Sequence, residues 1–294
     1  MRPADYARLV TLAALWGASY LFMRLAVPHI GSIAMVEGRT LIAGLVLFAF
    51  AALASQPVAF RRFWKHYLFI GAFAIAIPIT LIGLALRDID ASTAAILNAT
   101  SPLFSALIAS LWIHERLTVP KVAGIVLCIA GIAVLVGWTP QPMSSSELLA
   151  CGMSVCASIL YGYSSVYTKV YLNDAPPMGV AASASLFAAL LAAPFSPWHL
   201  LAAPVPAIAW LSVLGLGVLC TGIAFILYYR LIADVGPVRA MTVTLLVPLF
   251  GVFWGVVLLG EHLTPGRILG GAIILVGCGL ILGLLRLPSR ATAG

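Results

Sequence analysis

The residues of this sequence that could do chemistry are isolated polar side chains inside long apolar runs. Asn98, Ser101 and Ser105 recur at positions i, i+3 and i+7, which places them on one stripe of a helix. An amide or hydroxyl group in an apolar environment costs free energy unless it is hydrogen-bonded. The stripe therefore predicts either the polar wall of a binding cavity, with Asn98 and Ser101 in contact with a ligand, or hydrogen bonds between packed helices.

Aromatic side chains are the second candidate set for binding. Trp16 and Tyr20 are four residues apart and share a helix face, as do Tyr163 and Tyr167. Such rings can stack on an aromatic or apolar solute, and their faces attract a cation. Trp16, Tyr20 and Tyr163 lie well inside their runs, so we predict that they line a binding site; packing in the core is the alternative for each of them.

Three prolines interrupt apolar runs. Pro78, Pro102 and Pro248 each remove a backbone donor and free the carbonyl four residues earlier. A freed carbonyl can bind a polar ligand where the helix lines a cavity, and we predict this role for Pro78. A helix can also bend at such a point, and Pro102 and Pro248 are predicted to act as gating hinges. A fixed kink without a functional role is the alternative.

Charged side chains are sparse inside the runs. Glu37 and Arg39 lie about 9 Å from the start of their run at ~1.5 Å per residue, and we expect Arg39 to reach the membrane interface or pair with a neighbouring helix. Proton-coupled carriers usually place an ionisable group at the centre of a span, and none of the runs has an Asp, Glu, His or Lys there. The pattern favours movement of a solute down its gradient, with Glu37 as the group that could titrate in the proton-coupled alternative.

Catalytic and metal-binding patterns are not visible. The five histidines are far apart, the five cysteines have no CxxC spacing, and no Ser-His-Asp set or pair of carboxylates can be placed at mid-depth. We therefore predict that the protein is not an enzyme and binds no metal or cofactor.

Composition sets the class of protein. Hydrophobic residues make up 63% of the chain and charged residues 9%, with a mean hydropathy of +1.11, whereas soluble domains carry roughly 25% charged residues. The apolar runs are long enough to span a bilayer, which takes about 20 residues per helix. The net charge of +7 does not indicate nucleic-acid binding, because the basic residues are scattered between the runs.

We predict an all-α integral membrane protein with ten transmembrane helices, since helices satisfy every backbone hydrogen bond in lipid. The first run lacks a small-residue cleavage site and is taken as a retained span rather than a signal peptide. The predicted spans are Ala7–Val27, Ile33–Leu53, His66–Leu86, Ser92–Trp112, Val119–Trp138, Glu147–Tyr171, Met178–Phe195, Ala207–Ile232, Val238–Leu259 and Arg267–Leu285.

The chain contains an internal repeat. The segment Ala94–Gly137 aligns without a gap on Ala240–Gly283 after a shift of 146 residues. The aligned identities include Pro102 with Pro248, Glu115 with Glu261, Gly124 with Gly270, Gly131 with Gly277 and Gly137 with Gly283. Asn98 aligns with Thr244, and we predict that both line the cavity. More weakly, Trp16 aligns with Tyr161 in the first span of each half.

The repeat predicts two five-helix halves, residues 1–146 and 147–294. Because five is odd, the second half must enter the membrane from the opposite face, and such inverted repeats are typical of secondary transporters. Of the 16 Lys and Arg residues, only Arg24, Arg39, Arg87 and Arg267 lie on the side away from the N-terminus. This bias predicts that both termini are cytoplasmic.

The sequence resembles the EamA-type exporters of the drug/metabolite transporter superfamily over essentially its whole length. The resemblance rests on LWGASYLFMRLA from Leu15 to Ala26, on Arg39, on Ala94 through Pro102, and on the HERLT and GEHLT turns. It implies a ten-helix bundle of two inverted repeats in the bacterial inner membrane that exports small metabolites. The most similar group exports amino acids, including aromatic ones.

The resulting expectation is a monomeric exporter of amino acids and related metabolites that works by alternating access and facilitated diffusion. Its cavity is expected between the first, third and fourth spans and their counterparts, the sixth, eighth and ninth. The alternatives are a proton-coupled multidrug carrier and a carrier of sugar phosphates or nucleotide sugars, which share the fold. A phosphate carrier needs basic residues in the cavity, and none is expected at the midplane.

Overall fold

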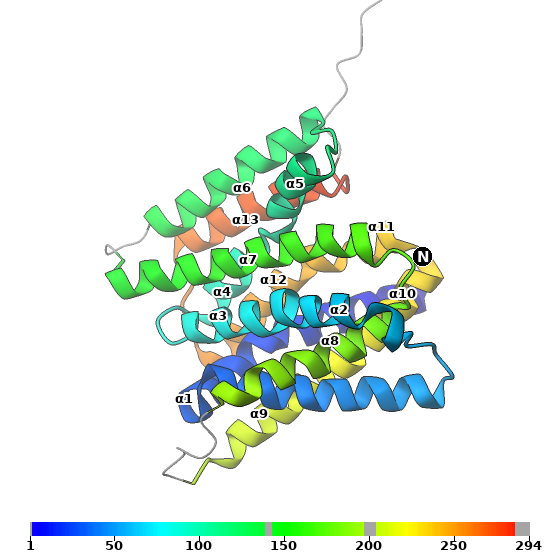
Figure 1. Cartoon of the computed structure of the whole chain (residues 1–294). Helices are drawn as coiled ribbons and strands as arrows, with labels where there is room; N and C mark the ends of the chain where they lie inside the picture. Colours follow the sequence, from blue (N-terminus) through cyan, green and yellow to red (C-terminus); the bar gives the residue numbers. More distant parts are fainter. Residues whose placement is uncertain (1, 139–142, 197–203, 286–294) are drawn as a thin grey trace, which may run out of the picture.

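The computed structural model describes residues 2–138, 143–196 and 204–285, and every regular element in these ranges is helical. The helices pack into a bundle in which segments far apart in the sequence lie against one another (Figure 1). This is the expected outcome for long apolar runs, since a helix pairs its backbone groups within a single segment.

The first helix, α1 (Pro3–Leu53), covers the first two predicted spans. Its 51 residues are interrupted at Gly31, which has φ 76° and ψ 165°. A side chain is rarely tolerated at such a φ, so glycine suits this position. The chain turns back there, and the two parts of α1 run in opposite directions (Figure 1). The predicted loop between the first two spans is therefore a tight turn at Gly31.

The other helices follow the predicted spans closely. In chain order they are α2 (Phe60–Ile70), η1 (Gly71–Ala76), α3 (Ile77–Ala85), α4 (Ala91–Asn98), α5 (Ser101–Trp112), α6 (Val119–Gly137), α7 (Ser145–Tyr171), α8 (Pro177–Ala192), η2 (Ala193–Phe195), α9 (Ala207–Gly217), η4 (Val218–Ile223), α10 (Ala224–Val235), α11 (Pro237–Ala240), α12 (Val243–Leu259) and α13 (Pro265–Ile281). The elements η1 and η4 are π-helical, and each continues the α-helices on either side of it.

Length and apolar composition make the described chain an all-helical membrane protein. Seven helical segments are long and apolar enough to cross a bilayer, and α1, with 51 residues, is one of them. The helices α12 and α13 are apolar but have only 17 residues each. The described C-terminal end stops at residue 285, so the predicted side of the C-terminus falls outside the described residues.

The helices α6 and α13 pack antiparallel through glycines. A methyl group at Gly124 would lie 2.5 Å from the carbonyl oxygen of Gly277, and one at Gly131 would lie 2.8 Å from the carbonyl oxygen of Gly270. Gly270 and Gly277 are the aligned counterparts of Gly124 and Gly131, so the contacts are crosswise. A crosswise pattern between equivalent residues is what a two-fold axis perpendicular to the helices produces.

A second pair of contacts has the same relationship. Gly17 of α1 packs on the backbone of Phe250 in α12, and Gly162 of α7 packs on the backbone of Phe104 in α5. Phe104 aligns with Phe250, and Gly17 corresponds to Gly162. The two π-helical segments also fall at equivalent positions, because Gly71–Ala76 and Val218–Ile223 differ by 147 residues at both ends. Both π-helices and Gly162 contribute to the wall of a cavity in the bundle.

Candidate functional site

A cavity of about 530 Å³ lies in the middle of the bundle. Its walls come from α1, η1, α3, α4, α5, α7, η4, α10 and α12, with single residues from α6 and α13. These elements include the six spans expected to enclose it. The second part of α1 also contributes, through Arg39 and Thr40, and this contribution was not expected. The volume lies within the range of about 300–1,000 Å³ that is typical of small-molecule sites.

Seven of the nine residues singled out in the sequence line this cavity. They are Trp16, Tyr20, Asn98, Ser101, Pro102, Thr244 and Pro248. The remaining lining is mostly apolar or aromatic, with a few polar side chains. Such a mixture is typical of a site that binds the apolar part of a ligand over a large area and orients it through a few polar groups.

Asn98 and Tyr20 form one side of the cavity together. Asn98 Nδ2 donates a hydrogen bond of 2.6 Å to the phenolic oxygen of Tyr20, and Asn98 Oδ1 accepts one of 3.3 Å from Ser158. The amide therefore joins α1, the end of α4 and α7 while it lines the cavity. The two alternatives raised for Asn98, a cavity wall and a bond between helices, are both present.

Two helix interruptions lie near the cavity, and at each of them a hydroxyl group donates to a backbone carbonyl oxygen. The regular α-helix is interrupted by a turn at residues 99–100, between α4 and α5, where Ser101 Oγ donates 2.7 Å to the carbonyl oxygen of Asn98. It is interrupted again between α11 and α12, where Thr244 Oγ1 donates 2.7 Å to the carbonyl oxygen of Met241. Side chains of this kind allow a helix to break in an apolar environment.

The repeat-related prolines occupy different positions in their helices. Pro102 lies at the start of α5, where the missing N–H group is not needed by the helix. Pro248 lies inside α12, five residues after that helix begins at Val243, and is buried. The break between α4 and α5 therefore lies directly before Pro102, whereas the break between α11 and α12 lies farther from Pro248.

Aromatic rings cover one wall. The ring of Trp16 lies 6.1 Å from that of Phe225 at an interplanar angle of 74°, and 5.2 Å from that of Tyr228. Trp16 and Phe225 both line the cavity. Edge-to-face pairs of this kind hold the rings in fixed orientations and leave part of their surface available to a ligand.

Pro78 and Tyr163 are not among the residues that line the cavity. Pro78 is buried at the start of α3, and its neighbour Ile79 faces the cavity instead. The ring of Tyr163 stacks on Trp112, with centroids 5.2 Å apart and an angle of 21° between the planes. Tyr161, two residues earlier on α7, lines the cavity in its place because a two-residue step turns about 200° around a helix.

Arg39 pairs with a neighbouring helix, the second of the two alternatives expected for it, and it also lines the cavity. Its side chain does not reach the membrane interface: the residue is only 8% exposed and lines the cavity. Its Nε donates 3.0 Å to Thr221 Oγ1 in η4, and its Nη1 lies 3.8 Å from the sulfur of Met23. The expectation of a cavity without a basic residue is therefore wrong. Arg39 lies eight residues after Gly31, about 12 Å into the span.

The described cavity lining does not extend to the start of α4, where polar contacts join several elements beyond this end of the cavity. Glu261 Oε1 accepts 2.7 Å from the backbone N–H of Ala91, and Glu261 Oε2 accepts 2.9 Å from the N–H and 2.5 Å from the hydroxyl of Ser92. Beside them Arg24 donates to the carbonyl oxygens of Leu86 and Ile89, and Arg267 pairs with Asp90.

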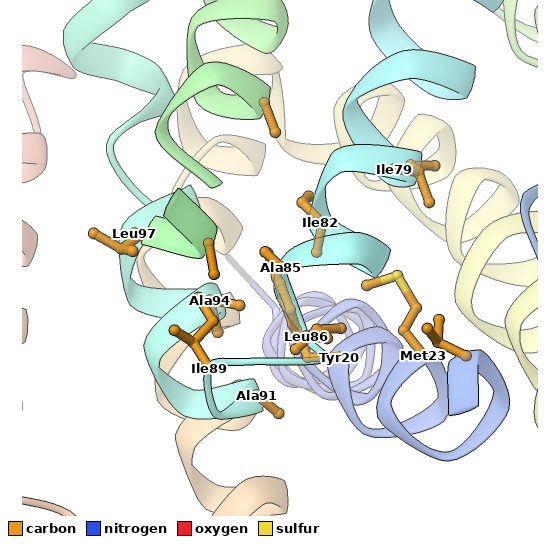
Figure 2. Packing of buried hydrophobic residues seen from close by; sticks show 14 of the residues in the cluster. Tyr20, Met23, Ile79, Ile82, Ala85, Leu86, Ile89, Ala91, Ala94 and Leu97 are labelled. Atoms are coloured by element: carbon orange, nitrogen blue, oxygen red, sulfur yellow. The ribbon is translucent and has the colours of Figure 1, made fainter. Parts of the chain in front are cut away.

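Apolar packing reinforces these contacts at the start of α4. Leu86, Ile89 and Ala91 are buried next to one another, and they continue the cluster that α3 and α4 form against Tyr20 and Met23 of α1 (Figure 2). Carboxylate bonds to free N–H groups at a helix start are favourable because they complete the first turn and meet the positive end of the helix dipole. The contacts hold the ends of α3, α4 and α12 together.

The opposite end of the cavity is open. Its lining includes Glu115 and Lys121, which follow α5, and Met241, which precedes α12 and is 39% exposed. Glu115 accepts from Lys121 Nζ at 2.6 Å and from Lys169 Nζ at 2.9 Å. These bonds lower the pKa of the Glu115 carboxyl from 4.5 to about 2. Glu115 and Glu261 are aligned in the repeat, yet only Glu261 holds a helix start.

Metal binding has no obvious place in this arrangement. Across the described ranges, no group of three or more His, Cys, Asp or Glu side chains could hold a metal ion. The lining can instead accept an organic solute, with apolar contacts to aromatic rings, neutral hydrogen bonds at Asn98 and one positive charge at Arg39.

Comparison with known proteins gives relatives of similar length. The chain is 26% identical over 281 residues to a probable terminal-alkyne amino-acid exporter of Streptantibioticus cattleyicolor, covering 93% of this chain and 91% of that protein. It is 22% identical to a probable amino-acid metabolite efflux pump of Salmonella typhimurium, covering 90% of each. An uncharacterized transporter of Archaeoglobus fulgidus is 21% identical, covering 92% and 95%.

A solved protein crystal structure has the same fold, with a TM-score of 0.65, 22% sequence identity, and coverage of 95% of this chain and 96% of the other. The model of the EamA-like transporter family matches the chain twice, at residues 6–137 and 148–283. A family of membrane transporters accounts for a cavity of this size inside an apolar helical bundle. The chain belongs to the EamA-like transporter family.

Proposed function

We propose that this transporter exports amino acids, including aromatic ones, and related small metabolites. The observation that carries the proposal is the cavity itself, in which aromatic rings, the Asn98 amide and the Arg39 guanidinium line one space of about 530 Å³. An amino acid side chain would contact the rings, and its polar end would meet the amide and the charge. The amino-acid exporter names of two distant relatives support this choice.

We infer a topology of ten spans in two inverted repeats, residues 1–146 and 147–294. The turn at Gly31 supports counting α1 as two spans, and α12 and α13 supply the last two. The crosswise contacts of Gly124 with Gly277 and of Gly131 with Gly270 support opposite orientations for the halves. The distribution of Lys and Arg favours a cytoplasmic N-terminus and an inner-membrane location.

In this orientation the cavity opens to the cytoplasm and is closed outside. The open end carries Glu115 and Met241, and the closed end carries Glu261 and Ser92. Alternating access then requires the Glu261 contacts to break while the other end closes. The different positions of Pro102 and Pro248 relative to their helix breaks support the idea that the two halves adopt different conformations of one repeat.

Facilitated diffusion is the transport mode that the lining favours. Glu115 is the one carboxylate among the described lining residues, and its pKa of about 2 keeps it charged at every physiological pH. A proton-coupled mechanism would need another group, and Glu37 on α1 is the candidate for that alternative.

The test is flux of radiolabelled amino acids in proteoliposomes with and without an imposed pH gradient. Movement and counterflow of several amino acids without a gradient would support a facilitated carrier. Transport that strictly depends on the pH gradient would favour a proton-coupled mechanism with Glu37 as the titrating group. If no amino acid moves under either condition while a drug or a phosphorylated metabolite does, the proposed substrate class is rejected.

A further inference from the structure

We propose that Arg39 forms a subsite for the carboxylate of the transported solute. This inference rests on the proposed function and narrows it, because it makes a free carboxylate the feature that the cavity recognises. The observations behind it are the burial of the guanidinium, its unused donors and the absence of a negative partner among the described residues.

The hydrogen-bond donors of Arg39 are mostly unused. A guanidinium has five N–H donors. The Nε donor is taken by Thr221, and Nη1 has only the Met23 sulfur at 3.8 Å, a weak acceptor. No hydrogen bond within the described ranges uses Nη2. Because Thr221 lies in the π-helical segment η4, a side-chain oxygen of that segment fixes the guanidinium at the cavity wall.

The charge of Arg39 is also unmatched. The ion pairs among the described residues do not include it, and the polar lining residues Tyr20, Tyr161, Cys220 and Thr221, which interact with it, carry no carboxylate. A buried charge without a counter-ion is costly. A carboxylate in the cavity would supply that counter-ion and could bind through two parallel N–H···O bonds, a geometry that arginine favours.

The rest of the lining suits a carboxylate better than a phosphate. The basic residues of the described lining are Arg39 and Lys121, and Lys121 lies at the mouth, paired with Glu115. A single buried positive charge balances the single negative charge of a carboxylate. A phosphate carries more charge and would lack a second buried cation. The aromatic wall at Trp16 and Phe225 would then contact the apolar part of the same solute.

The first experiment measures ligand-dependent thermal stabilisation of the detergent-purified protein. Its probes are phenylpropionate, phenylpropionamide and phenyl phosphate, so it does not depend on amino acid transport. We expect phenylpropionate alone to stabilise the wild type. Arg39→Gln should abolish that stabilisation, and Arg39→Lys should retain part of it. The exposed Arg87→Gln serves as the matched control and should behave as the wild type. Equal stabilisation by acid and amide, preference for phenyl phosphate, or an undiminished response in Arg39→Gln would overturn the subsite.

The second experiment measures counterflow of phenylalanine against phenylalaninamide in proteoliposomes. Removing one partner of a buried charge pair typically weakens binding by about 30-fold or more, so Arg39→Gln should raise the KM for phenylalanine by that factor and leave the amide unaffected. Equal transport of phenylalanine and phenylalaninamide by the wild type would contradict the carboxylate subsite but would agree with an amino acid exporter. If neither phenylalanine nor phenylalaninamide is transported but phenylpropionate still stabilises the wild type through Arg39, the carboxylate subsite is supported and the proposed amino acid export is rejected.

Discussion

Glu261 binds Ser92 twice, through the backbone N–H at 2.9 Å and the hydroxyl at 2.5 Å, although 169 residues separate them in the chain. The contact joins the loop after α12 to the first turn of α4. Its counterpart in the repeat, Glu115, binds Lys121 and Lys169 instead. The two aligned glutamates thus make different contacts, one at the start of α4 beyond the cavity and one beside the open mouth of the cavity.

Glu261→Gln should loosen the closed end. The variant replaces charge-assisted bonds, worth roughly 1.5–3 kcal/mol each, by weaker neutral ones, so the open state of that end should become about tenfold more populated. The measurement is the rate at which a membrane-impermeant maleimide labels a cysteine at Ala91, with the exposed Cys156 replaced by serine. Glu115→Gln is the matched control and should not raise that rate. An unchanged rate in Glu261→Gln would argue against this gate.

Transport should show little dependence on pH between about 5.5 and 8 when the pH is equal on both sides, because the Glu115 carboxylate in the cavity lining stays charged over this range. The pKa of Glu115 is lowered from 4.5 to about 2. A carboxyl whose pKa falls on folding stabilises the native state fully above its unfolded pKa, here 4.5, and loses this effect as the pH falls toward 2. Thermal unfolding in detergent should therefore reveal a Glu115-dependent loss of stability only below about pH 4.5. The Glu115→Gln variant should lack that component, and a Glu115-dependent change near pH 6 would contradict the assignment.

The sequence predicts the helices well because lipid leaves few choices. Apolar length and glycine or proline punctuation locate the segments, and Gly31, whose φ is 76°, marks the first turn as expected. The repeat also anticipates which helices pack together, since its aligned glycines become the crosswise contacts of α6 and α13. These features depend on backbone properties that residue type determines directly.

Rotation of a helix about its axis is harder to predict in a membrane protein. Almost every face of such a helix is apolar, so the hydrophobic pattern does not indicate which face meets the cavity. The position of Tyr163 well inside its run does not reveal that Tyr161 faces the cavity instead, although the alignment of Trp16 with Tyr161 is a usable signal. The distance of Arg39 along its run leaves both the membrane interface and a neighbouring helix open, and its partner Thr221, 182 residues away in the sequence, is not identified by any local pattern.

Tyr20→Phe and Asn98→Ala should be coupled in their effects on stability and transport. Either change breaks the 2.6 Å bond between Asn98 Nδ2 and the Tyr20 hydroxyl, and Tyr20→Phe leaves a donor beside the cavity without its partner. Each variant should lose about 1 kcal/mol of stability, and the double variant should lose less than the sum. Thermal denaturation in detergent and the KM for phenylalanine check this. Additive losses and an unchanged KM in all three variants would remove this pair from the site.

Trp16→Ala should discriminate between substrates. Trp16 lines the cavity and is held by Phe225 and Tyr228, so a ligand ring could gain about 0.5–1.5 kcal/mol from contact with it. The KM for phenylalanine should rise about 2- to 10-fold, while the KM for alanine should change little. Trp210, 48% exposed on α9 and not among the cavity-lining residues, provides the matched control. Equal changes for both amino acids would indicate loss of structure rather than loss of a ligand contact.

Close packing of α6 on α13 should make Gly124 intolerant of a side chain. A methyl group at Gly124 would lie 2.5 Å from the carbonyl oxygen of Gly277, whereas one at Gly137 on the same helix would meet nothing within 4 Å. Overpacking of this kind typically costs about 1–3 kcal/mol, so Gly124→Ala should lower the midpoint of thermal unfolding and Gly137→Ala should not. Because α6 and α13 carry few lining residues, the KM for phenylalanine should stay near the wild-type value in the folded fraction of both variants. A Gly124→Ala protein as stable as wild type would mean that the two helices are not held at this distance.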